Sequence, residues 1–160
     1  MFPFQADELY GQHVHASGGA APLPKATVFN KRDLALISKV ADLIIPATDT
    51  PGAVGAGVPY YIDYVVSADA RLKTQFQAGL VWLRQGKFSS MSKTKQVAFL
   101  EAVSKRAENG ENGDPEKFWR MFKSMTADGY YTSKIGLRDE LGYLGNTVLD
   151  HFPESQIREH

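Results

Sequence analysis

The chain has 160 residues, 43% of them hydrophobic, so it is long enough to bury one core and too short for two ordinary domains. Its 18 basic and 18 acidic side chains give zero formal net charge, which argues against an overall field that attracts nucleic acid or an anionic membrane. It contains no cysteine, which excludes disulfides, thiolate metal ligands, iron–sulfur clusters, covalent haem attachment and a cysteine nucleophile.

Residues 1–26 are predicted to form an extended arm. They show neither helical nor strand periodicity and contain three prolines and a run of small residues. They have neither the basic nor the apolar region of an export signal, and no run in the chain approaches the roughly 18 apolar residues of a membrane span. The arm is expected to lie along the domain or along a partner, because it carries four large apolar side chains: Phe2, Phe4, Leu9 and Tyr10.

Residues 27–160 are predicted to form one helical domain. Its first helix begins at a cap, Asn30, carries apolar residues at three- and four-residue spacing, and stops at Pro46. After a loop, Pro59 suits the first turn of a short second helix. This second helix is expected to have one aromatic face, formed by Tyr60, Tyr61, Tyr64 and Val65.

A third and a fourth helix follow in the middle of the chain. The third is expected to end near Gly86 and has an apolar stripe of Leu72, Phe76, Leu80 and Leu83. The fourth opens at Ser92 or Thr94 and stops at Asn109 and Gly110. Its inward-facing residues are predicted to be Val97, Leu100 and Val103.

The fifth helix has the strongest start signal in the chain, Asp114-Pro115-Glu116, in which Asp114 is expected to be the cap. Gly129 is expected to end it, after one face lined by Phe118, Met121, Phe122 and Met125. Residues 141–160 are predicted to be an irregular tail. Because no segment shows the apolar alternation of a strand, the fold is predicted to be all-α, a single compact domain of about five helices with long loops and an extended N-terminal arm.

The loop between the first two helices is the most specific feature. Residues 41–63 read A-D-L-I-I-P-A-T-D-T-P-G-A-V-G-A-G-V-P-Y-Y-I-D, with a helix stop, a turn, spaced glycines and a new helix start. Asp49 is interpreted as the residue that fixes the turn through backbone N–H groups, with a partner contact as the alternative. Asp63 is interpreted as a group that orients a tyrosine hydroxyl. The glycines do not predict a nucleotide site, because no strand precedes them and no phosphate-loop lysine follows.

No catalytic or metal site is predicted elsewhere. His13 and His15 alternate in the arm but lack further ligands, and adjacent carboxylates on a helix point about 100° apart and cannot converge on one bond. No G-x-S-x-G elbow is present. The abundant tyrosines are interpreted mainly as core residues, and a docking face built from some of them is the second interpretation.

Two motifs together resemble the gluconate 2-dehydrogenase subunit 3 family. One is the 41–63 stretch, and the other is G-Y-Y-T-S-K-I-G-L-R-D-E-L-G-Y at residues 129–143. The resemblance spans residues 30–152. It implies a non-catalytic small subunit that pairs with a large FAD-dependent flavoprotein of the glucose-methanol-choline oxidoreductase type, from which electrons commonly pass to a cytochrome c subunit.

The same resemblance implies what the chain contributes. The flavoprotein oxidises a sugar or sugar acid and holds the FAD, while this chain binds no cofactor and assists its folding, flavin loading and export in the periplasm or at a membrane. The chain departs from the family's pattern by lacking a twin-arginine signal, which fits a processed form or a cytoplasmic member. It also has Phe152-Pro153 where relatives often show Gly-Cys after the Phe, which implies non-covalent assembly.

Two other hypotheses stay open from the residues alone. One is a small enzyme that uses Asp49, Asp63 or a histidine, and the other is a free-standing helical domain that binds a sugar or a carrier. Under the subunit hypothesis, residues 48–58 of the loop and residues 129–143 are expected to form or support the partner interface. The candidate interface residues are Asp49, Pro51, Gly52, Tyr60, Tyr61, Tyr130, Tyr131 and Tyr143.

Overall fold

The computed structural model describes residues 25–137 and residue 141. Within these residues the fold is all-α, as predicted, with five α-helices, one short 3-10 helix and no strand. The elements are α1 (Lys31–Ile44), α2 (Val58–Ser67), α3 (Ala70–Gln85), η1 (Phe88–Ser90), α4 (Lys93–Glu108) and α5 (Asp114–Tyr131). Nearly all of the predicted arm and of the predicted tail lies outside the described residues.

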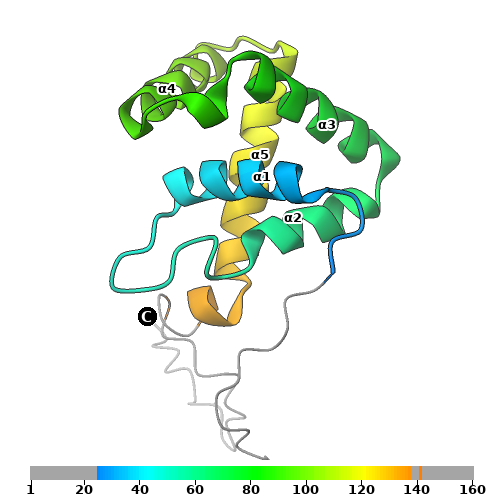
Figure 1. Ribbon diagram of the computed structural model, residues 1–160, viewed down its shortest axis with the longest axis vertical. Helices are drawn as coiled ribbons and strands as arrows, with labels where there is room; N and C mark the ends of the chain where they lie inside the picture. Colours follow the sequence, from blue (N-terminus) through cyan, green and yellow to red (C-terminus); the bar gives the residue numbers. More distant parts are fainter. Residues whose placement is uncertain (1–24, 138–140, 142–160) are drawn as a thin grey trace, which may run out of the picture.

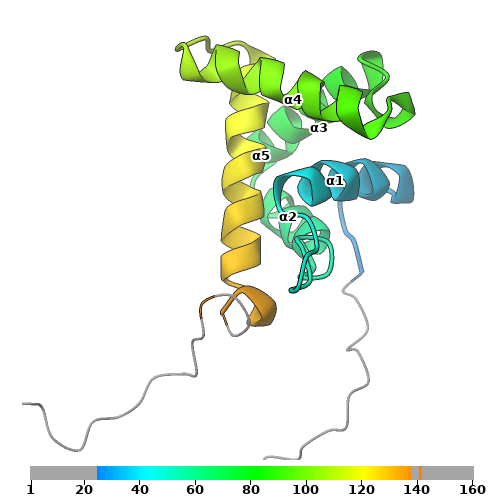
Figure 2. The ribbon, with the colours of Figure 1, turned by 90° about the vertical axis from the view of Figure 1, so that its left-hand side faces the viewer.

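Helix α5 is the axis of the domain, and α1 to α4 pack against it (Figure 1). Helices α3 and α4 cover the end where α5 begins, while α2 and the loop after α1 lie toward the end where α5 stops (Figure 2). None of the helices in the described ranges is long and apolar enough to cross a membrane.

The helix starts follow the local signals in the sequence. The Asn30 side chain accepts hydrogen bonds from Arg32 N (2.9 Å) and Asp33 N (3.0 Å), which confirms it as the cap of α1. The cap of α5 is Gly113 rather than Asp114, which lies inside the first turn and complements the positive end of the helix.

Gly129 lies within α5, so the prediction that it ends the helix is wrong. A Cβ at this position would come within 2.5 Å of the Tyr61 ring of α2. Gly129 is therefore required by the close approach of two helices and does not act as a cap.

The core is centred on phenylalanines from α3 and α5. Phe76 lies between Phe118 and Phe122, with ring centroids 5.3 and 5.5 Å away, and Phe29 covers it from the segment before α1. The predicted stripes of α3 and α5 face this core.

The aromatic face predicted for α2 is not its buried face, which carries Ile62 and Val66, and Tyr64 is 73% exposed. Of the inward residues predicted for α4, Leu100 and Val103 are buried and Val97 is not. Val97 is 38% exposed, and its neighbour Gln96 is buried instead. The Gln96 side chain donates a hydrogen bond to Phe88 O (2.9 Å), which satisfies a buried carbonyl of η1.

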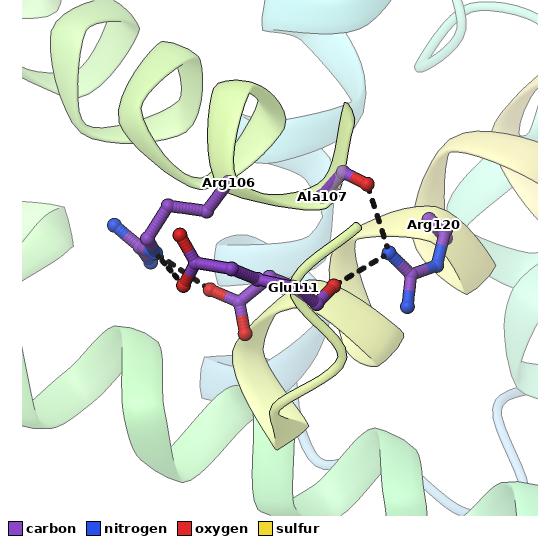
Figure 3. A network of polar contacts seen from close by, with 5 residues as sticks. Arg106, Ala107, Glu111 and Arg120 are labelled. Atoms are coloured by element: carbon purple, nitrogen blue, oxygen red, sulfur yellow. Dashed lines mark hydrogen bonds and ion pairs between the residues drawn. The ribbon is translucent and has the colours of Figure 1, made fainter. Parts of the chain in front are cut away.

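A polar network joins α4 to α5 (Figure 3). Arg106 Nε donates to the buried Glu116 carboxylate at 2.6 Å, and the Arg120 guanidinium donates to the carbonyls of Ala107 and Glu111 at the end of α4. The hydrogen bond from Arg106 lowers the pKa of Glu116 against the opposing effect of burial. Glu116 is thus an ionised, paired carboxylate that holds the helix junction.

Candidate functional site

The α1–α2 loop, residues 45–57, folds back on itself through its own backbone. Ala53 N donates to Ile45 O (2.9 Å), and Val58 N donates to Ala53 O (3.0 Å). Ala56 N and Gly57 N also donate within the loop, to Gly52 O and Val54 O. Because these N–H groups are already used, the glycine-spaced run is a closed turn and does not present them to a phosphate.

Gly52 is required by the tightest contact in this loop. A Cβ there would lie 2.4 Å from Ala47 N and 2.6 Å from Ile45 O, which are backbone atoms that cannot swing away. The buried Gly52 therefore lets residues 45–47 close over residues 52–53.

Asp49 does not fix this turn as predicted. Its side chain is exposed and makes no hydrogen bond to any described residue, and the turn is instead held by Thr48 N donating to Thr50 O at 3.0 Å. An exposed carboxylate on a closed loop is available to a partner, which is the alternative interpretation of this residue.

Asp63 holds the segment before α1 on α2. Its carboxylate accepts hydrogen bonds from Thr27 N (2.7 Å), Thr27 Oγ1 (3.0 Å), Val28 N (3.0 Å) and Phe29 N (2.8 Å). The expectation that Asp63 orients a tyrosine hydroxyl is wrong. Its position one residue after Ile62, on the face of α2 that is buried, could have indicated a structural role, because a buried carboxylate needs hydrogen-bond donors.

The charge on Asp63 is stabilised by this arrangement. Burial raises the pKa of its carboxyl group, but the hydrogen bonds from Thr27, Phe29 and Val28 outweigh burial and leave the pKa below the ordinary value of 3.8. A general base that works near neutral pH needs a raised pKa, so the environment of Asp63 favours a structural role.

The loop and the second motif meet at the end of α5. Thr50 Oγ1 lies 3.4 Å from the Tyr130 hydroxyl, and the Tyr61 ring covers Gly129. The rings of Tyr130 and Tyr131 pack edge to face with centroids 5.3 Å apart. Tyr130 is buried while Tyr131 is 44% exposed, so one ring anchors the loop and the other faces outward.

The α1–α2 loop, helix α2 and the end of α5 each present side chains outward. We call these side chains the tyrosine surface; they are Pro51, Val54, Tyr60, Tyr61, Tyr64 and Tyr131. Tyr64 is 73% exposed and Val54 43%, while Tyr60 and Tyr61 are half-buried. Gly52 and Tyr130, which were predicted for the interface, are buried and support this surface from beneath. Tyr143 lies outside the described residues. Val54 belongs to the loop predicted for the interface and Tyr64 to the tyrosines considered for a docking face, but neither was among the individual residues named for the interface.

The described residues include no group of three or more His, Cys, Asp or Glu side chains that could hold a metal ion. The four histidines and the adjacent pairs Asp7–Glu8 and Asp139–Glu140 lie outside these residues. The two buried carboxylates, Asp63 and Glu116, are each satisfied by structural donors.

A family model described as gluconate 2-dehydrogenase subunit 3 matches residues 31–147 of the chain. This match covers α1 to α5, the α1–α2 loop and the second motif, and therefore contains the whole tyrosine surface. Comparisons with curated proteins and with solved structures find no match.

Proposed function

The chain belongs to the gluconate 2-dehydrogenase subunit 3 family, and on that premise we propose that it is the non-catalytic small subunit of an FAD-dependent sugar dehydrogenase. Its partner is a large flavoprotein of the glucose-methanol-choline oxidoreductase type, with a cytochrome c subunit as a possible third component. This chain binds no cofactor, and the FAD belongs to the flavoprotein.

One observation supports this proposal above the others. The two segments that carry the family motifs converge at one end of α5, where Thr50 and Tyr130 are in contact, and they present aromatic side chains outward. Tyrosines combine a large contact area with a polar tip and are enriched at protein interfaces. The tyrosine surface is therefore the proposed contact with the flavoprotein.

The role proposed for the subunit is to assist folding, flavin loading and export of its partner, in the periplasm or at the membrane surface, with a cytoplasmic complex as the alternative. A small rigid domain can do this by covering an apolar surface that the flavoprotein exposes until it is complete. Closed loops and buried carboxylate clamps give the rigidity that such a template needs.

Copurification with a candidate flavoprotein dehydrogenase from the same organism tests the proposal. We expect the affinity-tagged chain to retain the flavoprotein, and we expect Tyr131→Ala to weaken the complex by about tenfold or more, because central aromatic contacts dominate interface energies. Val81→Ala is the matched control, since Val81 on α3 is 43% exposed, close to the 44% of Tyr131, and lies outside the tyrosine surface.

If Tyr131→Ala, Tyr64→Ala and Val81→Ala all bind the flavoprotein with equal affinity, the interface does not lie on the tyrosine surface. Failure of the wild-type chain to retain any flavoprotein would contradict the subunit role and favour a free-standing binding domain.

A further inference from the structure

The charges of this neutral chain are unevenly distributed. From residue 70 to residue 100 there is no acidic residue, while the same stretch contains six cations: Arg71, Lys73, Arg84, Lys87, Lys93 and Lys95. Four of the six lie between the last turn of α3, which contains Arg84, and the first turn of α4, which contains Lys93 and Lys95. Lys87 is the fourth and directly precedes η1. A strong local field therefore exists despite the zero net charge.

Helix α1 adds two more cations to the same place. Lys39 Nζ donates to Ser89 O of η1 at 3.3 Å, and Arg32, Lys39 and Arg84 line one hollow of about 320 Å³ beside η1. A second hollow of about 370 Å³, on residues 86–95, is lined by Lys87, Lys95 and the serines between them. We call this region the cationic surface; it consists of Arg32, Lys39, Arg84, Lys87, Lys93 and Lys95, all of them exposed.

Little negative charge offsets these groups. Asp33 forms an ion pair with Arg84 at 2.5 Å, but its side chain is only 17% exposed, whereas that of Arg84 is 50% exposed. Among the described residues, no acidic side chain lines either hollow. Within the part of the chain that the structure describes, the cationic surface thus carries more positive than negative charge.

Three of the lysines stand where helix and turn stability favour other residues. Lys87 has φ 55° and ψ 30°, the left-handed conformation that glycine adopts more easily, and it is the one non-glycine residue with positive φ in the described part. Lys93 and Lys95 lie in the first turn of α4, at the positive end of a helix whose first turn has no acidic residue. Arg71 and Lys73 occupy the same kind of position in α3, so the left-handed Lys87 is the conflict that distinguishes the cationic surface.

The side chains around the hollows indicate which anion they suit. Neither hollow is lined by an aromatic side chain. The larger apolar group is Leu36 in the first hollow, which is buried, and Met91 in the second, which is half-buried. The surface therefore lacks the exposed apolar anchors with which peripheral helices enter a membrane, and the aromatic platforms that stack nucleic-acid bases. Separated basic groups around shallow hollows suit carboxylates on a folded protein.

We infer that the cationic surface docks on a carboxylate-rich patch of the catalytic flavoprotein and steers the association of the two subunits; this inference rests on the proposed function. The tyrosine surface supplies the apolar contact, and the cationic surface accelerates encounter and sets orientation. Complementary charges act in this way mainly on the association rate, and salt screens them.

Association kinetics on the immobilised flavoprotein test the inference. The test variant is the double substitution Lys87→Glu with Lys95→Glu. The control is Arg71→Glu with Lys73→Glu, which makes the same change in charge at the other end of α3, about 20 Å away at 1.5 Å per residue. At about 50 mM NaCl we expect the test variant to associate about tenfold or more slowly, and the control to stay within about threefold of wild type.

Folding of the test variant is checked by its thermal midpoint. Lys95→Glu places an acid three residues after Ser92 in the first turn of α4, which is the pattern of a capping box, so the midpoint is expected to equal or exceed that of wild type. At about 500 mM NaCl the rates of the two variants and wild type are expected to converge.

Equal rates for the test variant and the control at low salt would overturn the inference. The inference would also be overturned if the wild-type chain bound vesicles with about 30% phosphatidylserine and the test variant did not. That result would assign the surface to lipid. Failure of the wild-type chain to bind the flavoprotein at any salt concentration would instead contradict the proposed function itself.

Discussion

Asp63→Asn removes half of the carboxylate that holds the segment before α1. Oδ2 accepts both bonds from Thr27, and Oδ1 accepts the bonds from Val28 and Phe29. An asparagine that keeps the second pair points its NH₂ group at Thr27 N, so the bond from this backbone N–H is replaced by a clash of donors and only the Thr27 hydroxyl can turn to accept. Hydrogen bonds to a charged group contribute about 1.5–3 kcal/mol each and are not additive, so we expect the free energy of unfolding to fall by about 2–4 kcal/mol.

Urea unfolding followed by circular dichroism at pH 7 measures this change. Asp69→Asn is the matched control, because Asp69 also accepts two backbone hydrogen bonds, from Arg71 N and Leu72 N, but is exposed at the start of α3. Asparagine caps helices as well as aspartate does, so the control is expected to lose less than about 0.5 kcal/mol. Equal small losses for both variants would refute the account of Asp63.

The pH dependence gives an independent check on the same residue. The pKa of Asp63 is lower in the folded protein than the ordinary value of 3.8. Its charged form therefore stabilises the fold above the unfolded-state pKa, and this contribution is lost as the pH falls through the folded-state pKa. The difference in unfolding free energy between wild type and Asp63→Asn should shrink below about pH 4. A constant difference from pH 7 to pH 3 would contradict the assignment.

Three further predictions follow from the described contacts. Gly52→Ala should destabilise the domain by about 2 kcal/mol or more, because its Cβ meets fixed backbone, whereas Gly110→Asn, at an open position with φ 87°, should cost less than about 1 kcal/mol in the same urea assay. Glu116→Gln should cost about 1–3 kcal/mol at pH 7 by losing the charged bond from Arg106, and less at pH 3; equal losses would argue against an ionised Glu116. Tyr131→Ala should change the unfolding free energy by less than about 1 kcal/mol, because the side chain is 44% exposed. A larger loss would make Tyr131 a core residue rather than an interface residue.

Local signals were enough to predict the helices. Asn30 and the proline at position 115 act within one turn of the backbone that they start, so their effect is independent of the rest of the fold. The apolar stripe of α3 was predicted for the same reason, because its spacing alone defines one face of the helix.

The errors at Asp63, Gly129 and the α2 tyrosines come from contacts between segments far apart in the sequence. Asp63 binds residues 34 to 36 positions earlier, and Gly129 is needed because the Tyr61 ring approaches it from another helix. The tyrosines of α2 were misassigned because Ile62 and Val66 form a narrower apolar row beside them, and only packing decides which row is buried. The candidate interface was assigned to its segments by resemblance, and that assignment stays a prediction.

Flavin occupancy of the large subunit tests the central claim most directly. The candidate flavoprotein would be expressed with and without this chain, purified by size exclusion, and compared by flavin absorbance per large chain. The account predicts that the two chains elute together and that the flavoprotein retains flavin fully only when this chain is present. A fully loaded flavoprotein that elutes alone, with this chain in a separate peak, would contradict the proposed role.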